Sequence, residues 1–277
     1  MSVKRRLVLI LCATIVISTV LVLHRQLTVD GLNASSGSSQ APHIVDADRQ
    51  AAQTQHAAKK QEQTVKPTDN AGQKPAAQKL PQEKKLAAPF VSQNPQLPNG
   101  CEITSLTMLL QSAGIKVTKM SLASQIKKVP FQSGGYMGNP NQGFVGNMYH
   151  GSRSNPGLAV YHRPIAELAR KYLGNRVVDF SGSSWLKVEQ QLAAGHPVWV
   201  ITSIHFQPVP AANWLTWRTR SGTIQITYQE HSVLVTGYDQ NEVYFNDPMS
   251  SQAGSHALKS SFVAAWRQFG CQAVTYH

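Results

Sequence analysis

A single thiol lies where the sequence predicts the start of a helix. Pro98, Asn99 and Gly100 interrupt the preceding segment, and Asn99 or Gly100 can cap the helix that follows. Apolar residues then recur at steps of three and four, namely Ile103, Leu106, Leu110 and Ala113. Gly114 follows them as a stop signal for the helix. Cys101 therefore occupies the first turn, where free N–H groups and the helix dipole favour negative charge. The sequence predicts a stabilised thiolate there.

A cysteine nucleophile needs an imidazole base, and the base needs a third group to orient it. Of the ten histidines, His231 is distinctive because it opens an alternating strand, and the chain then turns into a second strand that ends at Asp247. A symmetric turn at Gln240-Asn241 would set Asp247 opposite Leu234, roughly 10 Å along the strand from His231. Twist, a bulge or an early end to the pairing must close that gap. Asp239 is an alternative orienting carboxylate.

Other interpretations of these residues remain open at this point. Cys101 is also compatible with a small buried side chain, or with a disulfide to Cys271. Cys12 lies in an apolar run, and Glu102 can simply complement the positive end of the helix. No pair of His, Cys or carboxylate residues has metal-ligand spacing, so the sequence predicts no metal site and no cofactor.

The N-terminal 26 residues read as a signal anchor or a signal peptide. Basic residues precede an uncharged run from Leu7 to Leu23, which is near the minimum length for a membrane span. No small-x-small site follows, which favours an anchor over a cleaved peptide. We therefore expect a single-pass protein of the cell membrane with its remaining chain outside, or a secreted protein if the segment is cleaved.

Residues 27–88 are rich in Gln, Ala and Lys and lack a sustained apolar period, so we expect a disordered tether before a folded domain at 89–277. Residues 1–88 carry 12 basic and 6 acidic side chains and residues 89–277 carry 14 and 8, so each part is +6 and together they give the +12 of the chain. No nucleic-acid motif accompanies this charge. It favours anionic surfaces such as bacterial wall polymers or lipid headgroups as partners.

The folded domain is predicted to be α+β, with helices first and mostly antiparallel strands after them. Further helices are expected at 121–128, 163–173, 185–194 and 260–269, and strands at 177–180, 197–204, 224–228, 232–238, 243–245 and 272–276. The last of these reads as the edge of the sheet. A long Gly/Asn-rich loop spans 132–157. Several large side chains of this loop, and Tyr161 just after it, either line a substrate cleft or pin the loop to the surface. Those within the loop are Tyr136, Met137, Phe144, Met148 and Tyr149.

The order Cys101, His231, Asp247 resembles the papain-like cysteine peptidases. More narrowly, several segments are similar to stand-alone relatives of the double-glycine leader peptidases of bacteriocin exporters: Gln93 with Leu97-Pro98-Asn99-Gly100-Cys101-Glu102, Glu230 to Asp239, Val243 to Pro248, and Ala264-Ala265-Trp266. The similarity covers about residues 89–277. The ATPase and transmembrane domains of the exporters are absent from this sequence.

The resemblance implies a papain-like fold, with a helical lobe carrying the cysteine and a sheet lobe carrying His231 and Asp247. It implies amide hydrolysis with Cys101 as nucleophile, His231 as general base and then acid, and Asp247 as orienter. An upstream glutamine would stabilise the oxyanion, either Gln93, which we prefer, or Gln96. The expected substrate is a peptide or protein. The alternatives are a peptidoglycan amidase or endopeptidase with the same triad, and a non-catalytic wall-binding module on the same fold.

Overall fold

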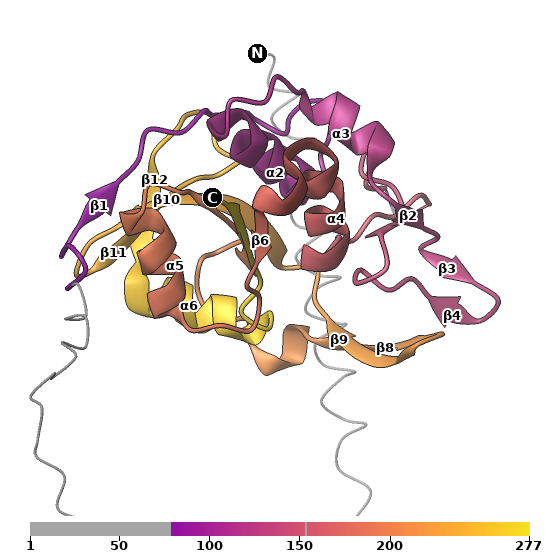
Figure 1. Ribbon diagram of the computed structural model, residues 1–277. Coiled ribbons are helices and arrows are strands. Elements are labelled where there is room, and N and C mark those ends of the chain that lie inside the picture. The colour runs from indigo at the N-terminus through magenta and orange to yellow at the C-terminus, as the bar shows by residue number, and fades with distance from the viewer. Residues whose placement is uncertain (1–78, 153) are drawn as a thin grey trace, which may run out of the picture. The chain divides into compact units, whose positions relative to one another are not determined.

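The computed structural model describes residues 79–152 and 154–277, and one antiparallel sheet runs through this part of the chain (Figure 1). The short strand β1 (Lys84–Lys85) also pairs with β10. The main strands follow one another across the sheet in this order: β12 (Ser255–Leu258), β11 (Glu242–Asn246), β10 (Glu230–Tyr238), β7 (Val198–Ser203), β13 (Ala273–Tyr276) and β6 (Val177–Asp179). The α+β class predicted from the sequence is confirmed.

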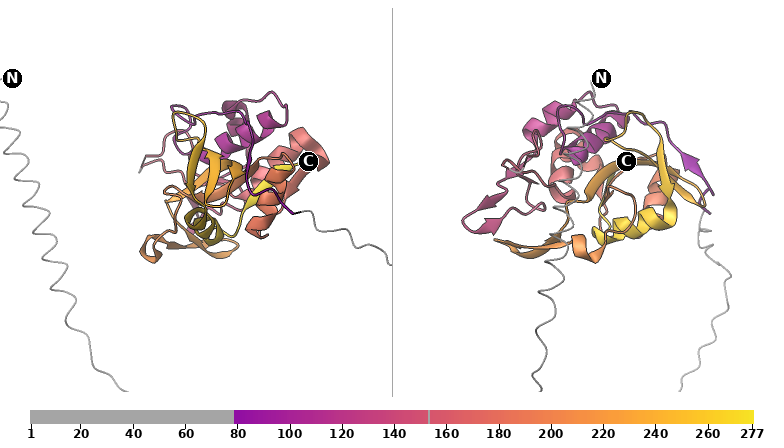
Figure 2. Two further views of the ribbon diagram at one scale, coloured as in Figure 1. Left: turned by 90° about the vertical axis from the view of Figure 1, so that its left-hand side faces the viewer. Right: turned by 180° about the vertical axis from the view of Figure 1, so that it is seen from behind.

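Helices cover both faces of this sheet (Figures 1 and 2). The helices α2 (Cys101–Ser112) and α4 (His162–Leu173) pack with Trp199 and Ile201 of β7. The helices α5 (Trp185–Ala193) and α6 (Lys259–Gln268) pack with Val198 and Val200 of the same strand. Because side chains alternate across a strand, β7 must be apolar on both faces. This explains its continuous apolar sequence and confirms it as a central strand.

Smaller elements join the two lobes and lie beside the main sheet. They are α3 (Lys119–Gln125), the parallel pair β2 (Lys128–Val129) and β5 (Phe144–Val145), the sheet β3 (Gln132–Ser133), β4 (Tyr136–Met137), β8 (Leu215–Thr219) and β9 (Gly222–Ile226), and the short helices η1 (Gly174–Arg176) and η2 (Ala211–Asn213). The sequence prediction gave a loop where β8 lies. Trp217 of β8 packs edge-on against Phe131 at 5.2 Å between ring centroids, so the strand forms through tertiary contact.

Several predicted boundaries were wrong. Helix α3 begins two residues before the expected Ser121, because Thr118 is its N-cap and forms a capping box with Ser121. Strand β12 lies where no strand was expected. Strand β13 is not an edge, since it pairs with β7 on one side and β6 on the other.

The folded domain also begins earlier than the predicted residue 89. Strand β1 pairs with Gly237 and Tyr238 of β10, and the Tyr238 hydroxyl donates to the Pro81 carbonyl at 2.9 Å. We call residues 79–93 the N-terminal arm. The arm is polar in sequence, so its composition resembled a tether, but its backbone supplies a strand to the sheet.

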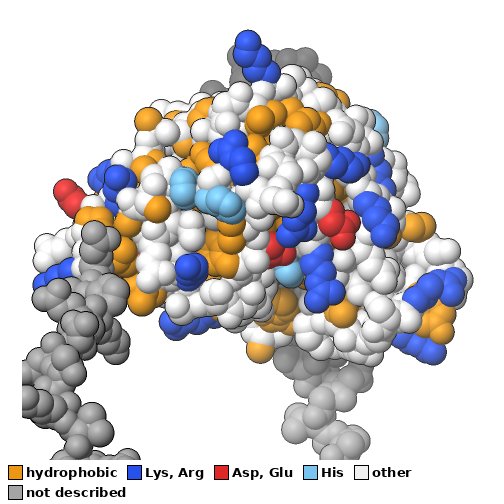
Figure 3. Space-filling model, in the orientation of Figure 1, with side chains coloured by type: hydrophobic (Ala, Val, Ile, Leu, Met, Phe, Trp, Pro, Cys, Tyr) orange, Lys and Arg blue, Asp and Glu red, His pale blue; other side chains and the backbone are white. Residues whose placement is uncertain are grey.

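The expected signal segment and most of the expected tether lie outside the described residues. Within residues 79–152 and 154–277, no helix has the length and apolar character needed to cross a bilayer. On the face shown in Figure 3, Lys and Arg side chains are spread among other side chains and do not form one patch.

Candidate active site

Helix α2 begins at Cys101, as predicted, with Gly100 as its N-cap. A Cβ at Gly100 would lie 2.7 Å from the Leu97 Cβ, so the tight approach to the helix requires glycine. The sulfur is buried, with 7 % of the residue exposed. It lies at a cavity of about 250 Å³ whose lining includes Gln93, Cys101, Glu230 and His231.

Two hydrogen bonds fix α2 against the sheet around the thiol. The Ser105 hydroxyl donates to the Ser232 carbonyl of β10 at 3.0 Å. The Trp199 indole N–H donates to the Glu102 carbonyl, also at 3.0 Å. All of these groups are buried, where such bonds define position strongly. The thiol is thereby held next to the first residues of β10.

The gap that the sequence left between His231 and Asp247 is closed by a bulge and an early end to the pairing. Tyr238 pairs with Val243, as a symmetric turn requires, but the register shifts between Val235 and Gly237, so that Leu234 pairs with Asn246. The ladder ends at Asn246. Asp247 then reaches back along β10, and its Oδ1 lies 2.7 Å from His231 Nε2.

This contact leaves one ring nitrogen of His231 for the cavity. With Nε2 donating to the carboxylate, the neutral imidazole carries its lone pair on Nδ1. Burial opposes ionisation of Asp247, but hydrogen bonds from His231 and from the Met249 N–H, together with the charge of His231, outweigh it and lower the pKa of Asp247. The ring also packs against Phe206, with centroids 6.1 Å apart.

Gln93 is buried and lines the same cavity, whereas Gln96 is exposed and is not part of the lining. The Gln93 side-chain amide donates to the Pro98 carbonyl at 2.7 Å, and its backbone N–H donates to the Pro248 carbonyl at 2.8 Å. Its Oε1 has no hydrogen-bond partner. The arm thus brings a polar amide to the thiol and ties it to the loop that carries Asp247.

The protonation of the thiol differs from the sequence prediction. Burial raises the pKa of Cys101 well above its ordinary value, and the charges of Glu102 and Glu230 raise it further, while a hydrogen bond with the Ser232 backbone lowers it. The helix terminus alone favoured a thiolate, but burial reverses the balance, with the help of two carboxyls that the sequence analysis did not assign to the site. The resting sulfur is a neutral thiol.

The sequence analysis did not assign these two carboxyls to the site, and it named Tyr161 only among the side chains that could line a cleft or pin the loop. Ligand atoms of Cys101, Glu102 and Glu230 all lie within 4.8 Å of one another. Tyr161, just before α4, is also close enough that both carboxylates raise the pKa of its hydroxyl, after burial, which is the larger cause. Adjacent Cys-Glu and Glu-His pairs were the only signal, because the fold alone brings residues 102 and 230 together.

The donor atoms of Cys101, Glu102 and Glu230 could also bind a metal ion, although their spacing in the sequence did not indicate a metal site. Both oxygens of Glu102 already have partners, the Val160 N–H at 2.6 Å and the Cys101 thiol at 3.4 Å. Burial raises the pKa of Glu102 to about 7 and that of Glu230 well above its ordinary value. These contacts favour protons over an ion.

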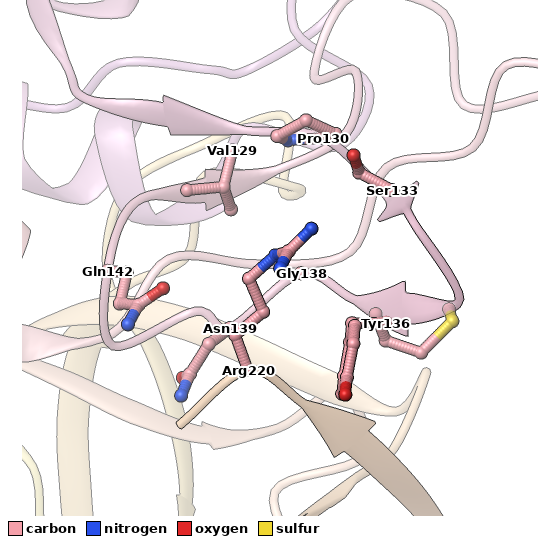
Figure 4. Close-up of a pocket in the computed structure, with 9 residues that line it drawn as sticks. Val129, Pro130, Ser133, Tyr136, Gly138, Asn139, Gln142 and Arg220 are labelled. Carbon is pink, nitrogen blue, oxygen red and sulfur yellow. The ribbon is translucent and has the colours of Figure 1, made fainter. Parts of the chain in front are cut away.

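The aromatic side chains of the long loop do not line this cavity. Phe144 and Met148 are fully buried in the core. Tyr136 and Met137 line a separate cavity of about 120 Å³ with Arg220, whose guanidinium lies 5.2 Å from the Tyr136 ring centroid (Figure 4). Of the two roles left open for these residues, lining a cleft does not apply at this cavity. Its lining includes Gly157, the last residue of the loop, and Leu158 just after it.

The structure also bears on two alternatives from the sequence, a Cys101–Cys271 disulfide and Asp239 as the orienting carboxylate. Cys101 and Cys271 are both free thiols, so they do not form a disulfide. The Asp239 carboxylate stays at the β10–β11 turn, where it accepts from the Tyr244 hydroxyl at 2.6 Å and from the N–H groups of Asn241 and Glu242. Asp247, not Asp239, contacts His231.

Comparisons with known proteins show what the chain is similar to. The pattern of the Peptidase_C39 like family matches residues 85–274. The chain is 53 % identical over 181 residues to the uncharacterized protein YvpB of Bacillus subtilis (strain 168), which covers 65 % of this chain and 70 % of that protein. A crystal structure of a candidate C39-like peptidase from Bacillus anthracis superposes with a TM-score of 0.68 at 45 % identity, over 70 % of this chain and 97 % of that one.

The family match begins in the N-terminal arm and includes the helix that carries Cys101, the strand that carries His231, and Asp247 just after β11. The Bacillus anthracis protein resembles this chain in sequence, at 45 % identity, as well as in fold. The papain-like α+β architecture expected from the sequence is therefore confirmed, and the chain belongs to the Peptidase_C39 like family.

Proposed function

We propose that this protein is a cysteine peptidase that hydrolyses peptide bonds with Cys101, His231 and Asp247. The observation that carries the proposal is a His231–Asp247 contact of 2.7 Å at a cavity that Cys101 also lines. Membership of a peptidase family supports the reaction type. A thiol, an imidazole and an orienting carboxylate are the parts that acyl transfer through a thioester needs.

In the first half of the reaction, the Cys101 sulfur attacks the peptide carbonyl and its proton passes to His231 Nδ1. The negative oxygen of the tetrahedral intermediate is placed toward the Gln93 amide and the Cys101 backbone N–H, which begins a helix and has no intrahelical partner. His231 then protonates the leaving amine, the C–N bond breaks and a thioester remains on Cys101.

In the second half, His231 takes a proton from water, whose oxygen attacks the thioester. The C–S bond breaks, the acid product leaves and the thiol regains its proton. Asp247 remains a carboxylate that holds the ring, consistent with its lowered pKa.

The chemistry is tested by incubating the full chain with a peptide library and, separately, with purified cell wall. We expect amide cleavage of peptides by the wild type and none by Cys101→Ser, while both unfold at the same urea concentration. Release of muropeptides without peptide cleavage would replace the proposal with a peptidoglycan amidase or endopeptidase. Cleavage of neither substrate, at equal Cys101 content, would leave a non-catalytic wall-binding module.

We also propose that the domain works outside the cytoplasmic membrane, held by the N-terminal segment. The support is the apolar run from Leu7 to Leu23 after a basic flank. Added protease should remove the domain from intact cells, and protection of the domain in intact cells but not in lysed cells would contradict this placement.

A further inference from the structure

The thiol proposed as nucleophile has a carboxyl group beside it. The Cys101 sulfur donates to Glu102 Oε2 at 3.4 Å inside the protein. The two residues are adjacent in the first turn of α2, and the backbone N–H of Val160 donates to the other Glu102 oxygen at 2.6 Å. The Glu102 side chain is therefore fixed with one oxygen at the sulfur. Complementing the helix terminus does not require burial of this kind.

A second carboxyl completes the cluster. Glu230 precedes His231 on β10, and its carboxyl lies within the 4.8 Å group formed with the sulfur and Glu102. Its Oε1 is buried without a hydrogen-bond partner. Two carboxyls in one buried site cannot both ionise at low cost, so they hold at least one proton between them near neutral pH.

We propose that Glu102, backed by Glu230, is a positioning residue that holds the proton on the Cys101 sulfur in the resting site. The proposal rests on the proposed function, because it concerns the same nucleophile. When Glu102 is a carboxylate, it accepts a hydrogen bond from the thiol and repels negative charge on sulfur, so the proton stays on sulfur until His231 Nδ1 takes it. When Glu102 is protonated, that repulsion ends.

Other titratable groups around the sulfur do not replace this role. His231 on β10 faces the cavity and is tied to Asp247 after β11. Tyr161, before α4, is kept neutral, since burial and the two carboxylates raise its pKa. Burial and both carboxyls likewise raise the pKa of Cys101. A neutral thiol is slow to alkylate or oxidise, so the site is protected until a substrate occupies it.

The test is the rate at which iodoacetamide alkylates Cys101 in the full chain, measured from pH 5 to 10 in EDTA. Mass spectrometry of the Cys101 peptide separates it from Cys12 and Cys271. Removing one charge this close to a thiol shifts its pKa by about one unit or more. We therefore expect Glu102→Gln to alkylate about tenfold faster than the wild type at pH 7, with its rate midpoint lowered.

Three further variants make the result specific. Glu230→Gln should shift the profile in the same direction and carries the test if Glu102→Gln does not fold. Glu102→Asp keeps the charge and should stay closer to the wild type than Glu102→Gln does. Glu167→Gln removes an exposed carboxylate of α4 and should leave the profile unchanged.

An unchanged or slower profile in folded Glu102→Gln and Glu230→Gln would overturn the inference. Faster alkylation of the wild type on adding EDTA alone would also overturn it, because a metal ion would then mask the sulfur. The measurement does not need a substrate. A shifted profile without peptide cleavage would therefore retain this inference and reject the peptidase activity, and cleavage without a shift would do the reverse.

Discussion

At the scale of single residues, the sequence contains two carboxylates that could orient His231, and the structure separates their roles. Asp247 bonds the imidazole, whereas Asp239 organises a turn. We expect Asp247→Asn to lower kcat/KM by about 10² to 10⁴, since it disturbs the ring tautomer. Steady-state cleavage by Asp239→Asn is the matched control and should remain within about twofold of the wild type. A larger loss in the control than in Asp247→Asn would reverse the assignment.

The buried Glu102 also makes stability depend on pH. Its pKa is raised to about 7 in the folded state, chiefly by burial, while the unfolded chain ionises near 4.5. The folded state therefore binds more protons across this window, and stability falls as the pH rises from about 4.5 to 7. Asp247 and Asp179, whose pKa values are lowered, are already ionised in both states at pH 5 and above.

We therefore expect the wild type to lose stability between pH 5 and pH 8, by up to roughly 3 kcal/mol from this group alone. Urea unfolding of Glu102→Gln at the same two pH values should show a smaller loss, because glutamine does not titrate. Glu167→Gln should keep the wild-type difference. Equal losses in all three proteins would show that Glu102 does not carry this dependence.

At the scale of elements, the sequence predicted the nucleophile helix and the two strands of the His–Asp hairpin because each has a strong local pattern. The structure confirms the start of α2 at Cys101 and the central position of β7. The bulge near Thr236 has no local signature, since it follows from pairing with β11 and β1 together. Strand β8 was missed for a related reason. One of its partners, β4, is distant in the sequence, so local pattern does not show that pairing, although the other partner, β9, follows β8 directly.

Gly237 tests the role of the arm as part of the sheet. A Cβ at this position would lie 2.4 Å from the Lys84 carbonyl oxygen, which is backbone and cannot move alone. We expect Gly237→Ala to lower the free energy of unfolding by about 1 to 3 kcal/mol through this overlap. Gly195→Ala also places a methyl on a glycine, but in open space and at a φ of +94°, so its urea midpoint reports backbone strain without a clash. A fully stable Gly237→Ala would mean that β1 is not a fixed strand.

At the scale of the whole molecule, the arm decides where the domain begins. Leu86 packs against the core beside α5 and α6, and the Asn246 side chain donates to the carbonyls of Ala88 and Pro89. Composition alone assigned this stretch to the tether, because burial of so few side chains leaves no apolar period. Sequence therefore predicted the start of α2 correctly, but it placed the start of the folded domain too late.

Two truncated chains test this boundary. A chain that starts at Lys79 should unfold at the same urea concentration as the full chain. A chain that starts at Pro89 lacks β1 and several buried hydrogen bonds, so we expect it to be roughly 2 kcal/mol or more less stable. Equal stability of the two truncated chains would return residues 79–88 to the tether.

The last strand of the chain lies inside the sheet, between β7 and β6, and β7 in turn supports the strand that carries His231. The sheet that supports His231 is therefore complete only once the residues of β13 have joined it.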